Sequence, residues 1–213
     1  MRQRLWIRAA IVVVAGMLAP ALAGVCLGQP PAGAVSAADA DRLDKKIVEI
    51  ARIGARTSAA PFQPDRARRT LVTEDETNAY LRFKIPGQLP VGLVDPHVTA
   101  LGEGRVSATA IVDLDAARRA NTKAGLDPTQ WLTGRLAVSV TGLLKTRAGM
   151  ATFALESASI AGIPMPRALL QQLVSHYTRS AEHPEGVGLD AQFVLPAGIR
   201  EIEIQLHQAV IVQ

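Results

Sequence analysis

Alternating apolar and polar residues mark several stretches of the chain, and the clearest example is residues 105–115. Every second position of this stretch is apolar: Val106, Ala108, Ala110, Val112 and Leu114. This period is typical of a strand that buries one of its faces. Residues 91–101 form a second extended segment, and the glycine-rich turn at 102–104 predicts a hairpin between the two. The pattern therefore predicts a long antiparallel ribbon.

A short helix is predicted immediately before this ribbon. Thr73 and Glu76 have the spacing of a capping box, in which each side chain accepts a hydrogen bond from a free backbone amide at the helix start. Pro86 and Gly87 cannot continue a helix, so the helix should end by Lys84. One helix that leads into an antiparallel ribbon is thus the organising unit of the predicted fold.

The same patterns predict the remaining elements. Apolar residues recur at helical spacing over 39–55, which indicates an amphipathic helix whose stripe either covers the core or contacts lipid or a partner. Two further strands are predicted over 135–145 and 150–160. A second apolar helix is predicted over 166–178, with a proline at its first turn. Alternation over 202–212 predicts one long terminal strand.

The first residues carry the pattern of an export signal. Arg2, Arg4 and Arg8 precede an apolar run, and Ala21-Leu22-Ala23 has the small-x-small pattern that a signal peptidase cuts. We expect residues 1–23 to be a signal peptide, with an uncleaved membrane anchor as the alternative. The protein would then be exported and lie in the periplasm or elsewhere in the cell envelope.

The composition after this leader divides the chain further. Residues 24–38 are rich in Pro, Gly, Ala and Ser, as in a flexible spacer. Residues 39–213 would form a single α+β domain. Cys26 is the only cysteine, so no disulfide can form within the chain. The domain must therefore be stabilised by burial and strand pairing.

Net charge limits the kinds of partner. The chain carries +4, and loss of the three leader arginines would reduce this to +1, while aromatic residues make up only 4%. Such a chain offers nucleic acid neither a basic surface nor a stacking platform, so we expect no nucleic-acid partner. A short basic run, Arg66, Arg68 and Arg69, leaves two interpretations open: a solvated connector, or contact with an anionic membrane surface.

No motif in the sequence specifies a reaction. The sequence has no Gly-x-Ser-x-Gly elbow, no phosphate-binding loop and no pair of histidines at metal-ligand spacing. Asp113 and Asp115 would project from the same face of a strand, where they are either a solvated edge or an acid–base pair. We therefore expect no enzymatic activity, no cofactor and no metal.

Two short motifs resemble a known family. Residues 73–81 read Thr-Glu-Asp-Glu-Thr-Asn-Ala-Tyr-Leu at the first helix, and a Gly-x-Pro-x-Pro turn over 162–166 precedes the second. These motifs and the order of elements over 70–213 resemble small bacterial envelope proteins allied to the tubular lipid-binding (TULIP) superfamily. The resemblance implies an α+β fold, with a curved antiparallel β-sheet wrapped around one or two helices, preceded by a signal peptide and an amphipathic helix.

The resemblance also implies a function. We expect a non-enzymatic exported protein that binds a lipid or another amphiphile in an apolar groove between the curved sheet and the helices. The side chains expected to line the groove are Tyr80, Leu81, Phe153, Leu155, Leu169, Leu170, Leu173 and Tyr177. The same residues are compatible with an ordinary core. The alternative function is an envelope scaffold or assembly partner that binds another protein through a sheet edge or the amphipathic helix. The sequence specifies neither the ligand nor the oligomeric state.

Overall fold

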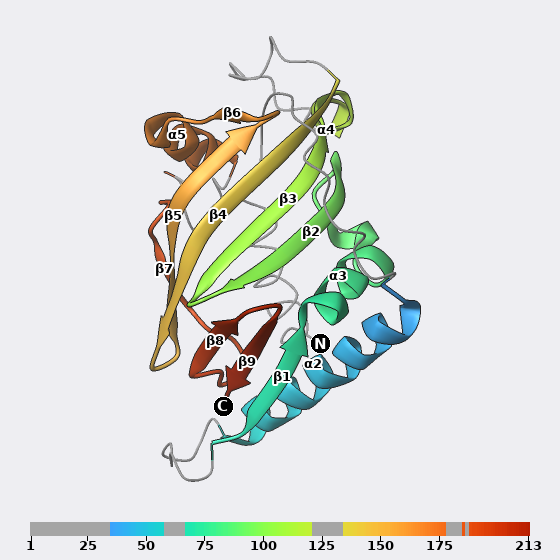
Figure 1. Cartoon of the computed structure of the whole chain (residues 1–213), viewed down its shortest axis with the longest axis vertical. Helices are drawn as coiled ribbons and strands as arrows, with labels where there is room; N and C mark the ends of the chain where they lie inside the picture. Colours follow the sequence, from blue (N-terminus) through green and yellow to red (C-terminus); the bar gives the residue numbers. More distant parts are fainter. Residues whose placement is uncertain (1–34, 58–66, 121–133, 178–184, 186–187) are drawn as a thin grey trace.

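The computed structural model describes residues 35–57, 67–120, 134–177, 185 and 188–213. Within them the chain has an α+β fold built from antiparallel sheets and helices, as predicted (Figure 1). The predicted signal peptide at 1–23, and the spacer except for its last four residues, lie outside this part of the chain.

Strands form two sheets of unequal size. The larger sheet has six strands, in the order β2-β3-β4-β5-β6 with β7 also paired to β5: β2 Leu93–Gly102, β3 Arg105–Asp113, β4 Arg135–Arg147, β5 Met150–Ile160, β6 Ile163–Pro164 and β7 Gln192–Val194. The smaller sheet has three strands, in the order β1-β9-β8: β1 Arg69–Thr73, β8 Glu201–Gln205 and β9 Gln208–Val212.

The helices lie around these sheets (Figure 1). Their bounds are α2 Ala37–Thr57, α3 Glu74–Phe83, the short 3-10 turn η2 Pro86–Gln88, α4 Leu114–Ala120 and α5 Arg167–Tyr177. The predicted capping box is present, since the Thr73 side chain accepts from Glu76 N and the Glu76 side chain accepts from Thr73 N. The amphipathic helix is slightly longer than the predicted 39–55 and includes the last residues of the expected spacer.

The ribbon ends earlier than the alternation predicts. Leu114 and Asp115 belong to α4 and not to a strand, because the Asp113 carboxylate accepts a hydrogen bond from Ala116 N (2.8 Å) and so caps a helix at this point. Asp115 instead accepts from Gly134 N (3.1 Å) at the start of β4. The expectation that the two carboxylates share one strand face is therefore wrong.

The predicted single terminal strand is also wrong. β8 and β9 are two strands that pair with each other, with Ile204 opposite Ala209. The chain reverses at His207, whose φ of 57° lies in the left-handed region although the turn contains no glycine. Apolar and polar residues alternate on both sides of the turn, so the sequence pattern resembles that of one continuous strand. β1 pairs with β9. The neighbouring arginines favoured a connector at this point, so this strand was not predicted.

Helix α3 takes the place of a neighbouring strand along the edge of β2. Asn78 donates from Nδ2 to Val98 O and accepts at Oδ1 from Val98 N, both at 2.8 Å. One turn earlier, Glu74 Oε2 accepts from Ala100 N at 3.0 Å. Four helical residues rise about 6 Å and two strand residues span about 6.6 Å, so helix positions 74 and 78 match strand positions 100 and 98.

The backbone of the β8–β9 turn completes this edge. His207 N donates to Ala100 O (2.9 Å), and His207 O accepts from Glu74 N (2.9 Å). Asn78 is 5% exposed, so its bonds are made in a largely dry environment. The edge of β2 at these two residues is therefore closed, and α3, β2 and the smaller sheet are held in one arrangement.

Removal of the Asn78 amide tests this edge. We expect Asn78→Ala to lower the free energy of unfolding by about 2–3 kcal/mol, because both backbone groups of Val98 lose their partner in a buried setting. Arg82→Ala changes an exposed position of the same helix and should stay within about 0.5 kcal/mol of the wild type. Chemical denaturation measures both, and equal stability of the two variants would contradict the role given to Asn78.

Candidate functional site

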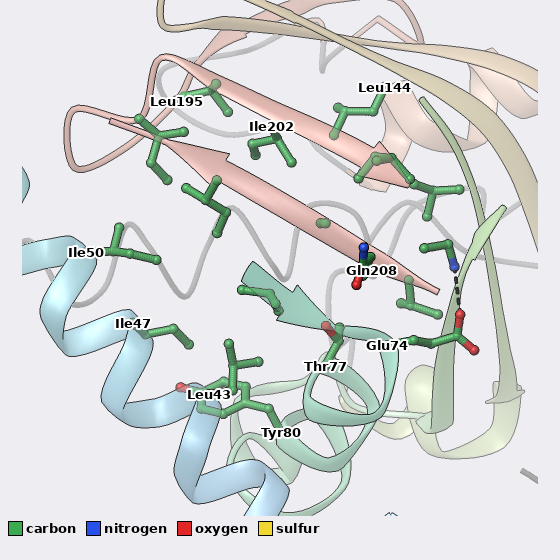
Figure 2. A pocket seen from close by; sticks show the side chains of 18 of the residues that line it. Leu43, Ile47, Ile50, Glu74, Thr77, Tyr80, Leu144, Leu195, Ile202 and Gln208 are labelled. Carbon is green, nitrogen blue, oxygen red and sulfur yellow. Dashed lines mark hydrogen bonds between the residues drawn. The ribbon is translucent and has the colours of Figure 1, made fainter. Parts of the chain in front are cut away.

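A cavity of about 230 Å³ lies between α2, α3, the smaller sheet and the adjoining parts of the larger sheet (Figure 2). Apolar side chains from both helices, from both sheets and from residues 195–199 form most of its wall: Leu43, Ile47, Ile50, Val72, Tyr80, Leu81, Val98, Ala100, Val106, Leu144, Phe193, Leu195, Pro196, Ile199, Ile202, Ile204, Ala209 and Ile211. A water-sized group takes about 30 Å³, so the space would hold about eight methylene groups of an alkyl chain.

Helix α2 forms one wall of the cavity. Its residues Leu43, Ile47 and Ile50 lie on one helical face and point toward the sheet strands (Figure 2). Among the described elements, α2 packs chiefly against α3. The helix therefore stands alongside the smaller sheet and leaves space between them.

An ion pair fixes α2 to α3 and β1. Lys46 Nζ donates to the two carboxylate oxygens of Glu76 at 2.7 and 2.8 Å and to Leu71 O at 2.7 Å. Glu76 is only 4% exposed, and its carboxylate also accepts the amide of Thr73 in the capping box. Three elements thus meet at one buried carboxylate.

A second anchor holds the other half of α2. A Cβ atom at Gly54 would collide with the carbonyl group of Ala197, so the helix and the 197–198 turn can approach this closely only at a glycine. Gln213 bridges the same two segments, since its Nε2 donates to Ile50 O (2.9 Å) and to Ala197 O (2.7 Å). Helix α2, whose apolar face lines the cavity, is therefore anchored at two points along its length.

The polar groups of the wall are few. Thr77 donates from Oγ1 to Thr73 O (3.0 Å), and Gln208 donates from Nε2 to Gln205 Oε1 (2.7 Å). Glu74 is the only acidic or basic side chain among the described residues that line the cavity. Its Oε2 accepts from Ala100 N and lies 3.1 Å from Nδ1 of the exposed His207 ring.

Two of the side chains predicted to line a groove do line this cavity. Tyr80 and Leu81 project from α3 into its wall, and each is 1% exposed. Leu170 lies elsewhere, in a separate buried cluster with Ala158, Val174 and Leu189, and Leu155 packs half-buried against that cluster. These α5 and β5 residues are therefore packed against one another, away from the cavity.

The remaining predicted residues also lie away from the cavity wall. Leu169 is 40% exposed on α5, and Phe153 is half-buried on β5 with its ring against Gly142. The side chains of Leu173 and Tyr177 lie outside the described part of the chain. Figure 1 places α5 and α2 at opposite ends of the larger sheet, so the α5 side is a second packing region.

Several lining residues were missed at the sequence level. Ile202, Ile204 and Ile211 face the cavity from the β8–β9 hairpin. Their alternation was visible in the sequence, but the single terminal strand predicted from it gave them no place beside α3. The stripe on α2 was recognised as apolar without being assigned to a site.

The described residues contain no cluster of three or more His, Cys, Asp or Glu side chains that could hold a metal ion. None of the helices in the described part of the chain is long and apolar enough to span a membrane. In comparisons with protein-family models, with curated proteins and with solved structures, nothing matches this chain.

Removal of Lys46 tests the anchor of α2. We expect Lys46→Met to lower the free energy of unfolding by about 3 kcal/mol, because the buried Glu76 carboxylate loses its closest cation and keeps, among the described groups, only Arg42 Nε, at 3.6 Å. Lys45→Met replaces an exposed lysine of the same helix and should change stability by less than about 0.5 kcal/mol.

A double-mutant cycle with Glu76→Gln then isolates the pair. Since each single variant breaks the same contact, the two effects should be non-additive by at least about 1 kcal/mol, as measured by chemical denaturation. Additive effects would show that Lys46 and Glu76 do not stabilise the fold through each other.

Proposed function

We propose that this protein is an exported, non-enzymatic carrier that binds the hydrocarbon part of a lipid or another amphiphile in the cavity between α2, α3 and the smaller sheet. The observation that carries the proposal is a space of about 230 Å³ whose wall is almost wholly apolar. Small ligands bind preferentially in concave apolar sites with few polar groups, which is the composition found here.

The energetic cost of this space supports the proposal. Protein interiors leave few voids larger than a water molecule. At about 24 cal/mol per Å³, a fully enclosed void of this volume would cost on the order of 5 kcal/mol, and a pocket that is partly open to solvent costs less than this. The cost of the enclosed void is comparable to the whole stability of many domains, about 5–15 kcal/mol. A bound chain would remove this cost, whereas a protein with no ligand would gain by filling the space with larger side chains.

Binding would come from burial of the alkyl chain. Each methylene contributes about 0.8 kcal/mol, so eight methylenes give about 6 kcal/mol before the cost of immobilising the ligand. The affinity for a short single chain should therefore be no tighter than tens of micromolar. The alkyl chain of a longer lipid would have to extend out of the cavity.

Curvature of the larger sheet and export of the protein are part of the same proposal. The larger sheet would curve around α3, so that its inner face and the smaller sheet enclose the ligand, as the resemblance to tubular lipid-binding proteins implies. Export through a cleaved signal peptide at 1–23 would deliver the protein to the periplasm or the cell envelope, where amphiphiles must cross water between membranes.

Other partners gain less support from the described residues. A protein partner that added a strand at β2 would find the backbone of Val98 and Ala100 already bonded to α3 and His207. Two arginines of the basic run, for which membrane contact was one of two interpretations, are paired with carboxylates: Arg68 with Glu49 (3.7 Å) and Arg69 with Glu203. We therefore place ligand binding ahead of a scaffold role.

Filling the cavity tests the function directly. Ala209 lies in the cavity wall on β9, so Ala209→Phe should occupy the space and abolish binding. Ala137→Phe makes the same change at an exposed position of β4 and should bind as the wild type does. We expect native mass spectrometry of the mature protein, purified without detergent, to show a co-purified amphiphile in the wild type and in Ala137→Phe but not in Ala209→Phe.

Titration with the neutral apolar dye N-phenyl-1-naphthylamine gives the same comparison after any co-purified ligand has been extracted. We expect dye fluorescence to rise on binding to the wild type and to Ala137→Phe only. A wild type that carries no amphiphile and binds no dye would contradict the proposed function, as would equal binding by the two phenylalanine variants.

A further inference from the structure

We infer that the cavity selects an amphiphile whose head group is neutral or cationic and donates hydrogen bonds, such as an alcohol or an amine, and that the head group lies beside Glu74. This inference rests on the proposed function and names the class of ligand for the same site. It follows from the kind of polar atoms that the wall presents and from where they lie.

The polar groups of α3 lie together on one side of the cavity. Figure 2 shows Glu74 and Thr77 near the β2 side, while Ile50 and Leu195 lie across the cavity from them. A bound alkyl chain would bury its apolar part among the second group. Its polar end would then meet the first residues of α3.

Glu74 has unused capacity as an acceptor. Both of its hydrogen bonds to described groups, from Ala100 N and with His207 Nδ1, involve Oε2. No described group bonds to its Oε1. The side chain is 17% exposed, so this oxygen lies in a mostly dry setting where a donor from a ligand would be strongly favoured.

The Thr77 hydroxyl can likewise only accept a hydrogen bond from a ligand. Its hydroxyl hydrogen is donated to Thr73 O at 3.0 Å, which leaves only the lone pairs of Oγ1 for a ligand. Two of the amides at this helix start are occupied as well: Glu74 N donates to His207 O, and Glu76 N donates to Thr73 Oγ1. Beside Glu74 and Thr77, a head group would therefore meet acceptors.

Positive charge is missing from the wall. No lysine, arginine or histidine is among the described residues that line the cavity. Lys46, which directly precedes the lining residue Ile47 on α2, already donates to Glu76 and to Leu71 O. A carboxylate or phosphate head group would meet the Glu74 carboxylate, whose basic neighbour, the exposed His207 ring, already lies 3.1 Å from Oε2. Like charges in a poorly solvated site repel strongly.

Three probes with the same alkyl chain test the inference. Octanol, octylammonium and octanoate fit the available length and differ only in the head group. At neutral pH we expect octanol and octylammonium to displace N-phenyl-1-naphthylamine from the wild type at concentrations at least about tenfold below that of octanoate. Glu74→Gln keeps an oxygen acceptor for Ala100 N and removes the charge.

We expect Glu74→Gln to bind octanoate about tenfold more tightly than the wild type and octylammonium about tenfold more weakly, with octanol changed little. Asp75→Asn removes a carboxylate from the next, exposed residue of α3 and should leave all three affinities unchanged. Thermal melts verify that both variants fold.

The outcomes separate this inference from the proposed function. Octanoate binding as well as the other two probes, or unchanged affinities in Glu74→Gln, would overturn the head-group inference and leave the carrier function standing. If none of the probes displaces the dye, or if the dye itself does not bind, the proposed function fails and the inference fails with it.

Discussion

The arrangement of this protein depends on how the edge of β2 is satisfied. A strand at the edge of a sheet must find partners for its outward N–H and C=O groups. Here Asn78 and Glu74, one helical turn apart, bond to alternate residues of the strand. This bonding sets α3 against β2, and the buried Glu76 on the same helix then binds Lys46 of α2. The polar residues of one short motif thus position two helices and, through His207, the smaller sheet.

The cavity follows from that arrangement. Lys46 and the close approach of Gly54 to Ala197 anchor α2 at two points along its length, and the helix packs against α3 more than against the strands. The residues that line the cavity include Ala100 and Ala209, whose small side chains fill little of its volume. An unfilled apolar volume costs stability in proportion to its size. The polar contacts around the cavity fix the positions of its walls, and the protein's own side chains leave the space between them unfilled.

Locally encoded features were predictable from the sequence, and long-range ones were not. Thr73 and Glu76 lie three residues apart, so the start of α3 could be inferred from spacing alone. The bond between Asn78 and Val98 spans twenty residues, and nothing in the neighbourhood of either residue reveals it. Tyr80 and Leu170 were both expected to line a groove. The sequence could not show that Tyr80 meets a space while Leu170 meets a packed neighbour. The hairpin turn at His207 escaped prediction because its left-handed residue is not a glycine.

The central claim is that the space enclosed by α2, α3 and the smaller sheet is open to an apolar guest. Methyl NMR under xenon pressure measures this most directly, on protein from which any co-purified ligand has been removed. Xenon enters dry apolar cavities and shifts the resonances of the methyl groups around it. We predict saturable shifts that are confined to wall residues such as Ile47, Leu195 and Ile202, with those of Leu170 unchanged. An absence of saturable shifts, or weak shifts scattered over surface methyl groups, would contradict the account.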